Sequence, residues 1–435
     1  MDAAAPEPVE VLIERAGAAV ARAAVDVLGG TYGRRVVVIA GKGNNGADGR
    51  AAALRLRRRG VKVNVVEAGA GPSRLPAVDL VVDAAYGTGF RGAWDAPDPG
   101  GAPVLAVDIP SGVDGLTGEA GGKVLPADRT VTFAALKPGL LLGRGREVSS
   151  AVEVVDIGLD VGWPASWLVE AADVAGWLPQ RATGTHKWEA GVWLMAGSPG
   201  MTGAAFLAAR GAQRAGAGYV RLSTPGGAPG GGTPIEVVGV PLPDRGWADQ
   251  VLEGLDRFRA GVVGPGLGSG HADDIRRVAA QASVPLVVDG DGLTALGTEV
   301  ADHVRPSTVL TPHDGEYRRL TGSAPEADRL AAARRLAVHS GCTVLLKGPT
   351  TVVAGPDGGV LVSTAGGPEL ASAGTGDVLA GVIAALMAQG LDPFRAATAG
   401  AFLHGRAGRL GPRRGLVAGD LPDLLPAATQ HLQES

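Results

Sequence analysis

The residues best suited to chemistry in this 435-residue chain lie in short glycine-rich segments that carry an aspartate. Residues 373–381 read Ala-Gly-Thr-Gly-Asp-Val-Leu-Ala-Gly, so Asp377 follows small residues and precedes an apolar helical pattern. Backbone N–H groups of such a turn, at a helix N-terminus, form an anion hole for a transferred phosphoryl group. Asp377, in the first helical turn, could accept the proton of a hydroxyl nucleophile. The alternative is an acidic residue that only complements the helix dipole.

A second set of polar residues lies in the first half of the chain. Residues 41–49 read Gly-Lys-Gly-Asn-Asn-Gly-Ala-Asp-Gly, between an apolar run and a helical pattern. Glycines there let the backbone approach a ligand, and a helix N-terminus favours anionic groups. The spacing differs from the ordinary G-x-G-x-x-G dinucleotide fingerprint. Asn44 and Asn45 can bind a monovalent cation or a ligand, or they can simply stabilise a turn.

Two further aspartates end apolar runs in this half. Asp83 lies in Val-Asp-Ala-Ala-Tyr-Gly-Thr-Gly at 82–89, and Asp108 begins Asp-Ile-Pro-Ser-Gly-Val-Asp-Gly at 108–115. Either side chain could simply cap a turn. Because both follow strand-like runs, we expect both to project toward the asparagine segment and to form a site with it.

Alternating strands and helices must position these residues. In the first half, apolar spacing predicts helices over residues 11–28 and 50–59, a turn over 41–49, and strands over 36–40, 61–66, 80–83 and 104–108. Such alternation predicts a parallel sheet covered on both faces. Ligands bind beyond the carboxyl ends of the strands in these sheets, where the polar residues are placed.

The second half shows the same α/β pattern without repeating the sequence. Strands are expected over residues 192–196, 220–223, 261–264, 286–289, 308–310, 344–347, 351–354 and 360–363, with a Gly/Pro-rich loop over 224–234. Between the halves, prolines and Trp163, Trp167 and Trp177 predict a junction whose tryptophans pack between domains. We expect two α/β domains, residues 1–160 and 184–435, joined by a junction over 161–183.

The composition excludes several classes of protein. Hydrophobic residues make up 45% of the chain and charged residues 19%, which excludes disorder of the whole chain. The net charge of −4, with both signs scattered, argues against nucleic-acid binding. Residues 1–10 lack the pattern of a secretion signal, and no uninterrupted apolar stretch spans a membrane, so we expect a cytoplasmic protein without membrane contact. The single Cys342 lies in an apolar run and is expected to be buried and inert.

The three segments of the first half resemble the NAD(P)H-hydrate epimerase family, whose pattern is G-x-G-N-N-G-G-D-G, V-D-A-x-x-G-T-G and D-I-P-S-G in that order. The resemblance covers about residues 11–160 and implies a Rossmann-like three-layer αβα sandwich, with Ala47 replacing one family glycine. It implies that Asp108 is the acid/base residue and that Asn45, Asp83 and Ser111 hold potassium. The hydrated nucleotide would contact Asp108 together with Asn44, Asn45, Gly46, Ala47, Asp48, Gly87, Thr88, Gly89, Phe90, Arg91, Gly92 and Ala93.

The second half resembles the ribokinase-like superfamily at residues 373–381 and, more narrowly, the ADP- or ATP-dependent NAD(P)H-hydrate dehydratases. The narrower resemblance rests on six segments in the family's order, at 184–187, 196–204, 264–268, 289–292, 311–316 and 346–351. It implies a ribokinase-like αβα domain in which Asp377 is catalytic and the hydrate contacts Ala204, Gly266, His313 and Asp377. The adenine nucleotide, with Mg²⁺, would contact Lys347, Gly348, Pro349, Thr350, Thr351, Gly374, Thr375 and Gly376.

Together the resemblances imply an enzyme that epimerises the R and S hydrates of NADH and NADPH and dehydrates the S hydrate. A hydroxyl is a poor leaving group, and a phosphate ester at the same carbon can be eliminated. The donor, ADP or ATP, and the preference for either hydrate stay open, and a homo-oligomer is expected. One alternative, a vitamin-precursor or sugar kinase with an accessory nucleotide-binding domain, leaves Asn44 and Asp108 without a purpose. The other, a non-catalytic nucleotide sensor, does not require the intact Asp108 and Asp377.

Overall fold

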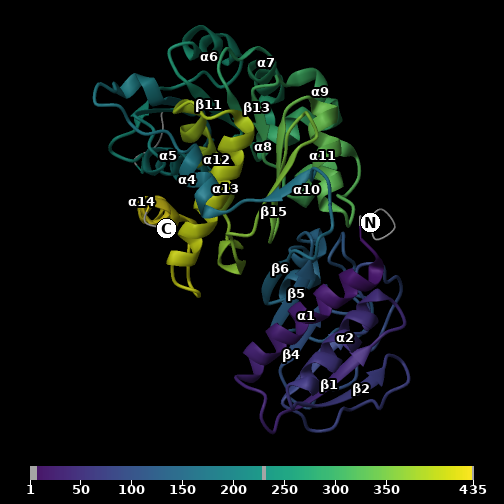
Figure 1. Cartoon of the computed structure of the whole chain (residues 1–435). Coiled ribbons are helices and arrows are strands. Elements are labelled where there is room, and N and C mark those ends of the chain that lie inside the picture. The colour runs from purple at the N-terminus through teal and green to yellow at the C-terminus, as the bar shows by residue number, and fades with distance from the viewer. Residues whose placement is uncertain (1–6, 228–231, 434–435) are drawn as a thin grey trace. The chain divides into compact units, whose positions relative to one another are not determined.

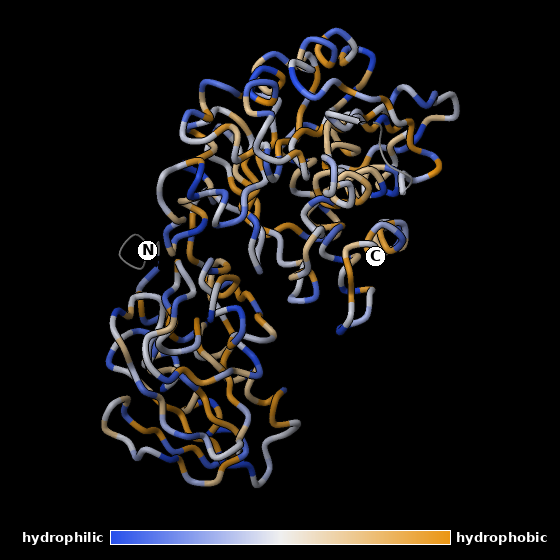
Figure 2. The backbone as a smooth tube through the Cα atoms, turned by 180° about the vertical axis from the view of Figure 1, so that it is seen from behind, coloured by the Kyte–Doolittle hydropathy of each residue, from blue (hydrophilic) through white to orange (hydrophobic). Residues whose placement is uncertain are grey.

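The computed structural model describes residues 7–227 and 232–433, and the chain divides into two compact units, Met1–Pro164 and Ala165–Ser435 (Figure 1). Within each unit many of the hydrophobic segments lie in the interior (Figure 2). The expected junction is not a separate segment beyond Pro164, because β7 (Ser166–Leu168) joins the sheet of the second unit. Trp177 ends α4 (Ala171–Trp177) and packs against that unit's core, while the expected packing of the tryptophans between the domains stays a prediction. Residues 228–231 of the expected loop lie outside the described residues.

The first unit contains a six-stranded sheet in which all strands run parallel, in the order β2-β1-β3-β4-β5-β6. Its strands are β1 (Arg35–Ala40), β2 (Lys62–Glu67), β3 (Leu80–Ala84), β4 (Val104–Val107), β5 (Arg129–Phe133) and β6 (Ala151–Val155). The sequence predicted the first four strands within one or two residues, since β3 and β4 are continuous apolar runs buried on both faces. It did not predict β5 and β6, whose polar residues interrupt the apolar run.

The two faces of this sheet are covered differently. Helices α1 (Val9–Leu28) and α2 (Asn44–Arg58) pack together over one face, with Leu12, Val20 and Leu56 in the core. The other face is covered mostly by segments without regular secondary structure, which contribute Leu75 and Trp94, and by the short helix α3 (Gly143–Val148). The parallel α/β architecture is therefore confirmed. The layer over this second face is mostly non-helical, which differs from a sheet covered by helices on both faces. Residues 68–79 and 85–103 contain too many glycines and prolines to continue a helix.

Helix α2 begins at Asn44. The prediction of a turn over residues 41–49 is therefore wrong for residues 44–49, which are helical. The reason is a close approach of backbones. A Cβ atom at Gly46 would lie 1.9 Å from the carbonyl oxygen of Gly41, so only glycine lets the first helical turn pack there. Both asparagines consequently project from the N-terminal turn of a helix, where backbone N–H groups are exposed to a ligand.

The second unit contains a ten-stranded sheet in the order β10-β9-β8-β11-β12-β13-β14-β15-β16-β7, in which β15 alone is antiparallel to its neighbours. Besides β7, its strands are β8 (Gly191–Met195), β9 (Tyr219–Ser223), β10 (Val238–Gly239), β11 (Ala260–Val263), β12 (Leu286–Val288), β13 (Thr308–Leu310), β14 (Thr343–Leu346), β15 (Thr351–Ala354) and β16 (Val360–Ser363). Every strand predicted for this half is present, with bounds shifted by at most one residue.

Helices cover both faces of the second sheet. They are α5 (Thr202–Arg214), α6 (Ala248–Leu255), α7 (Ala272–Gln281), α8 (Asp291–Leu296), α9 (Val300–His303), α10 (Asp314–Thr321), α11 (Arg329–Ser340), α12 (Thr375–Ala388), α13 (Pro393–Leu410) and α14 (Leu421–Gln433). On β8, Leu194 belongs to the core shared with α5 and α12, while the neighbouring Trp193 meets α6 on the opposite face. This alternation is the sign of a strand buried between two layers.

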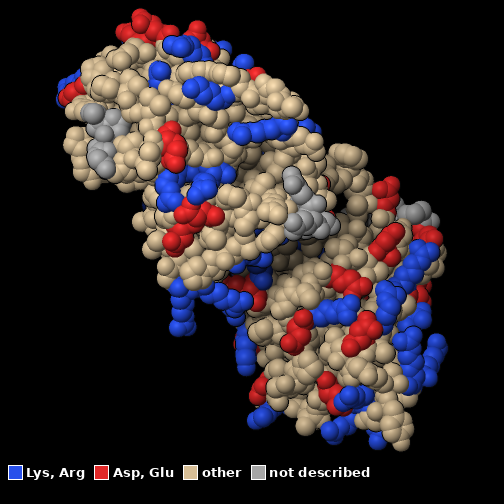
Figure 3. All heavy atoms as spheres, turned by 90° about the vertical axis from the view of Figure 1, so that its left-hand side faces the viewer, with Lys and Arg blue, Asp and Glu red and all other residues tan. Residues whose placement is uncertain are grey.

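The surface carries no charge of one sign over a large area in the view of Figure 3, where acidic and basic side chains are intermixed. Among the described residues, no helix has both the length and the apolar composition needed to cross a bilayer.

Cys342 is fully buried, as expected, and burial raises the pKa of its thiol to about 12.

Tight packing of α5 on α12 gives a first prediction. A Cβ atom at Gly381 would lie 1.9 Å from the carbonyl oxygen of Ala208, so Gly381→Ala must separate the two helices. Overpacking of this kind costs about 1–3 kcal/mol, and thermal denaturation should show a lower Tm. Gly203→Ala on α5 is the matched control, because its added methyl group meets nothing within 4 Å. Equal Tm values for both variants would contradict this packing.

Candidate functional sites

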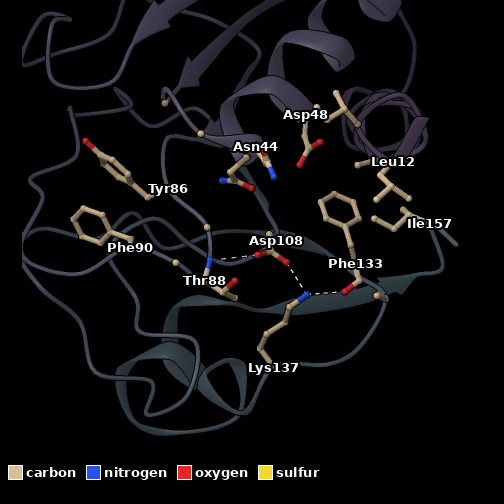
Figure 4. A pocket seen from close by; sticks show the side chains of 18 of the residues that line it. Leu12, Asn44, Asp48, Tyr86, Thr88, Phe90, Asp108, Phe133, Lys137 and Ile157 are labelled. Atoms are coloured by element: carbon tan, nitrogen blue, oxygen red, sulfur yellow. Dashed lines mark hydrogen bonds and ion pairs between the residues drawn. The ribbon is translucent and has the colours of Figure 1, made fainter. Parts of the chain in front are cut away.

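A cavity of about 1200 Å³ opens at the carboxyl ends of β1, β3, β4 and β5 in the first unit (Figure 4). It is lined by the predicted residues Asn44, Asn45, Asp48, Gly87, Thr88, Gly89, Phe90, Arg91 and Asp108. Four other predicted residues do not line it, namely Gly46, Ala47, Gly92 and Ala93. Gly46 acts instead in packing the start of α2, and Ala47 is a helical residue of α2 that needs no special backbone conformation.

Asp108 lies near the centre of this cavity in a strained backbone conformation. Its φ of 67° is in the left-handed region, which is uncommon outside glycine. Its N–H donates to Val131 of β5 at 2.7 Å, which fixes the turn after β4. One carboxylate oxygen forms a 2.7 Å ion pair with Nζ of Lys137. A Cβ atom at Gly87 would lie 3.2 Å from the other oxygen and 3.4 Å from the amide carbon of Asn45, so the three predicted segments do meet.

Asp83 and Ser111 form a buried pair beneath the cavity. Ser111 donates from its hydroxyl at 2.6 Å and from its backbone N–H at 2.9 Å to the two oxygens of Asp83. Burial raises the pKa of Asp83, and the hydrogen bonds from Ser111 oppose that rise. Asn45 is also buried, and neither polar atom of its amide has a hydrogen-bond partner among the described residues. Leaving a buried amide unpaired costs about 1–3 kcal/mol, which indicates a place for a ligand or an ion.

Lys137 is a residue of this site that the sequence did not predict. Its ammonium group contacts Asp108 and also donates to Thr132 Oγ1 at 2.8 Å and to the carbonyl oxygen of Phe133 at 2.7 Å. It follows β5, so recognition of that strand would have placed it at the same sheet edge. Across the cavity from Tyr86 and Phe90, an apolar wall contains Leu12, Phe133 and Ile157 (Figure 4).

The second unit gathers charged side chains at the carboxyl ends of three adjacent strands. Asp289 follows β12, Thr311 follows β13 and Lys347 follows β14. Lys347 Nζ lies 2.7 Å from Asp289 Oδ1, which also accepts the hydroxyl of Thr311 at 2.7 Å. The buried carboxylate of Glu316, from α10, lies 3.7 Å from the same ammonium group. The sequence assigned a role to Lys347 but none to Asp289 or Glu316.

Asp377 lies in the first turn of α12, as the sequence predicted. Gly374 precedes it with a φ of 90°, a conformation that favours glycine. A Cβ atom at Gly376 would lie 3.3 Å from Lys347 Nζ, so the glycine turn adjoins the cluster of charges. Burial raises the pKa of Asp377 to about 7, with a contribution from the charge of Asp289, while Lys347 opposes the rise. A carboxylate with such a pKa can accept a proton at neutral pH.

Of the other residues expected to contact the hydrate, Ala204 lies in the first turn of α5, Gly266 lies in a loop, and His313 directly precedes α10. Gly266 adopts a φ of 65°, and a Cβ atom there would lie 3.1 Å from Cβ of Ala204, so these two residues adjoin. His313 is the N-cap of α10, where Nδ1 accepts the N–H groups of Gly315 and Glu316. In a neutral ring Nε2 then carries the proton. It lies 3.6 Å from Glu316 Oε1 on a side chain that is 56% exposed, so it can donate to this carboxylate or to a ligand.

The segment over residues 347–351 is held by a residue that the sequence did not predict. Arg329, on α11, donates to the carbonyl oxygen of Lys347 at 2.7 Å and pairs with Asp314 at 2.9 Å. Thr350 is buried and Thr351 begins β15. His404 is buried in α13, and burial lowers its pKa to about 4.

Comparison with known proteins gives a consistent result for both units. Residues 192–430 match the family model described as NAD(P)H-hydrate dehydratase, and residues 9–75 and 67–139 match the model of the YjeF-related protein N-terminus. A bifunctional NAD(P)H-hydrate repair enzyme Nnr from Moorella thermoacetica is 37% identical over 98% of this chain and 93% of its own. The protein of the same name from Escherichia coli K12 is 35% identical over 89% of this chain and 84% of its own.

Among solved structures, an ADP/ATP-dependent NAD(P)H-hydrate dehydratase from Bacillus subtilis, co-crystallised with ATP and Mg²⁺, is 29% identical to this chain. The match covers 60% of this chain and 97% of that one, with a TM-score of 0.52. A ribokinase-like superfamily protein from Enterococcus faecalis shares the fold with 22% identity, a TM-score of 0.55, and coverage of 63% of this chain and 98% of its own.

The fold thus defines an α/β protein whose first unit is built on a six-stranded parallel sheet and whose second unit shares the fold of a ribokinase-like superfamily protein. Full-length similarity makes the assignment narrower. The chain belongs to the family of bifunctional NAD(P)H-hydrate repair enzymes.

The charges around Asp377 predict a pH dependence. If Asp377 accepts a proton, the kcat/KM for nucleotide-dependent turnover should rise with pH, with a midpoint near 7. Glu316→Gln should lower that midpoint, because the negative charge of Glu316 raises the pKa of Asp377. The amide keeps an oxygen that can accept the N–H of His313. Asp302→Asn, at an exposed position on α9, is the control and should not move the profile. A midpoint that rises in Glu316→Gln would contradict this assignment.

Proposed function

We propose that the chain repairs hydrated NADH and NADPH by two reactions, an epimerisation in the first unit and a dehydration in the second. The observation that carries the proposal is a pair of aspartates, each placed at the carboxyl edge of a sheet. Asp108 forms an ion pair with Lys137, and Asp377 follows a glycine turn that adjoins the Lys347–Asp289 pair. Full-length similarity to bifunctional NAD(P)H-hydrate repair enzymes supports the combination. An enzyme that dehydrates one epimer leaves the other unused unless an epimerase supplies it.

In the first unit, the cavity volume of about 1200 Å³ is sufficient for a dinucleotide. The hydrated carbon of the nicotinamide ring carries a hydroxyl group and is also bonded to the ring nitrogen. When Asp108 takes the hydroxyl proton, the C–O bond becomes a carbonyl and the C–N electron pair goes to nitrogen, which is protonated. Closure of the open ring on the other face of the carbonyl returns the proton and inverts the carbon. Asp108 is the acid/base residue of this step.

In the second unit, Asp377 takes the proton of the hydrate's hydroxyl group as the hydroxyl oxygen attacks the terminal phosphorus of the nucleotide. The bond from that phosphorus to its bridging oxygen breaks, and the nucleotide leaves with one phosphate fewer and with the electron pair of that bond. Backbone N–H groups of Gly374 to Gly376 stabilise the charge on the transferred phosphoryl group. The resulting phosphate ester leaves as phosphate with the C–O electron pair, and loss of a ring proton restores the conjugation of NAD(P)H. Lys347 provides positive charge beside the transferred group.

Mg²⁺ fits the second site as a companion of the nucleotide. No group of three or more His, Cys, Asp or Glu residues able to hold a metal exists in the described part of the chain. Mg²⁺ commonly binds through substrate phosphates with few protein ligands, and it neutralises phosphate charge. The co-crystallisation of the Bacillus subtilis dehydratase with ATP and Mg²⁺ supports the same pairing here.

Potassium fits the first site because of two buried groups. Asp83 is a carboxylate in a buried setting, and the side-chain oxygen of Asn45 is buried without a partner among the described residues. A monovalent cation held by Asn45, Asp83 and Ser111 would neutralise the carboxylate and use the amide oxygen.

The two activities should separate by single substitutions. With R hydrate as substrate, Asp108→Asn should slow conversion to the S hydrate by about 100-fold or more while leaving the dehydration of S hydrate unchanged. Asp377→Asn should slow the dehydration of S hydrate by about 100-fold or more and leave the interconversion of R and S hydrates intact. Chromatography of the epimers and the near-ultraviolet absorbance of the reduced ring measure the two steps. Loss of both activities in one variant, at wild-type Tm, would contradict the division between the units.

Potassium dependence provides a separate test. Epimerisation should be faster in KCl than in LiCl at equal ionic strength, and K⁺ should raise the Tm of the wild-type chain. Asp83→Asn should remove both effects, because it removes the buried charge that the cation neutralises. A K⁺ response that persists in Asp83→Asn would rule out this cation site.

A further inference from the structure

Lys137 uses all three of its ammonium protons inside the first site. It contacts Asp108 Oδ1 at 2.7 Å, Thr132 Oγ1 at 2.8 Å and the carbonyl oxygen of Phe133 at 2.7 Å. Its side chain is 17% exposed and that of Asp108 is 14% exposed, so the ion pair is shielded from water. Interactions between charges are stronger in such a setting than at a surface. A lysine with three occupied donors holds its partner in place and has no proton directed elsewhere.

The two oxygens of Asp108 are thereby distinguished. Oδ1 receives the ion pair with Lys137 and lies 3.3 Å from the hydroxyl of Thr132. Oδ2 is on the side of Gly87 and Asn45 and accepts a long hydrogen bond of 3.4 Å from the N–H of Thr88. Figure 4 shows Asp108 between Thr88 and Lys137, with Asn44 and Asp48 on the far side of the cavity. Oδ2 is thus the oxygen able to take a further proton donor.

The backbone at Asp108 makes such support necessary. A φ of 67° is strained for a residue other than glycine, and strained residues persist where their surroundings over-determine them. The hydrogen bond from Asp108 N–H to Val131 of β5 anchors the backbone, and Lys137, four residues after the end of the same strand, anchors the side chain. One strand therefore fixes both parts of the residue.

We propose that Lys137 is a positioning residue for epimerisation, which locks Asp108 Oδ1 and directs Oδ2 at the hydroxyl group of the hydrated ring. The inference rests on the proposed epimerase function of the first unit. It assigns to Lys137 a role in the orientation of the base, and substrate affinity is left to the asparagine and glycine segments. Loss of Lys137 should therefore lower kcat with little change in KM.

The test uses Lys137→Met, which keeps an unbranched apolar stem as far as Cε and removes the ammonium group. The expected result is a kcat for conversion of R to S hydrate that falls about 100-fold, with KM within about threefold of the wild-type value. Dehydration of S hydrate by the same preparation should be unchanged, and this internal control reports the integrity of the chain. Thr132→Val, which keeps the ion pair, is the matched control and should lose less than about tenfold.

A chemical rescue separates orientation by the ammonium group from a merely structural role. Cys342 is fully buried, so Lys137→Cys introduces the one thiol that 2-bromoethylamine can readily reach. Alkylation restores an ammonium group at nearly the length of lysine, and we expect it to recover at least a tenth of the wild-type kcat. The unmodified variant should stay as slow as Lys137→Met.

Wild-type kcat in Lys137→Met, or a loss confined to KM, would overturn the inference. So would an alkylated Lys137→Cys variant that stays slow while its S-hydrate dehydration and Tm match those of the wild type. Failure of the proposed function gives a different result, because the unmodified wild-type chain would then not interconvert the epimers at all. That outcome would also remove the basis of this inference.

Discussion

Carboxylates placed out of water at the edge of a parallel sheet are the constraint on which both units depend. A buried negative charge must be neutralised, hydrogen-bonded or protonated, and the chain uses all three solutions. Asp108 and Asp289 each receive a lysine at 2.7 Å. Asp83 is held by the hydroxyl and N–H groups of Ser111. Asp377 receives less compensation, and its pKa consequently lies near 7.

The two units reach this arrangement with the same geometry on different sheets. In each, a strand ends in an aspartate, a glycine-rich turn approaches it, and a lysine comes from the end of another strand of the same sheet. Parallel strands bring their carboxyl ends to one edge, so residues far apart in sequence meet there. The difference lies in the adjoining helix. The first turn of α2 contains two asparagines. Helix α12 instead begins in a glycine-rich turn whose backbone N–H groups suit a phosphoryl group.

Much of this could be predicted from the sequence, because the residues that define each site lie in local motifs. The continuous apolar runs before Asp83 and Asp108 predicted their strands and their common edge, and the structure brings Asp108 beside Gly87 and Asn45. Asp377 was expected in the first turn of a helix for the same local reason. The roles of these residues in substrate binding stay predictions.

What the sequence did not predict depends on contacts between distant segments. The role of Lys137 depends on its ion pair with Asp108, which comes from a different strand end. Strand β5, which precedes Lys137, was not predicted because threonines interrupt its apolar pattern. Helix α2 begins earlier than expected because Gly46 packs against the backbone of Gly41. Helix propensities of single residues do not report such a contact. Arg329 lies on α11 and supports Lys347 through its carbonyl oxygen, a role that only the folded chain defines.

The central claim is that one chain carries both reactions, and an equal mixture of R and S hydrates tests it most directly. The wild-type chain, with Mg²⁺, K⁺ and ADP or ATP, should restore the near-ultraviolet absorbance of all the reduced nucleotide, faster than the hydrates interconvert spontaneously. Recovery should require the nucleotide. Rapid recovery that stops at the S half would contradict the proposed epimerase, and no recovery with either nucleotide would contradict the repair function as a whole.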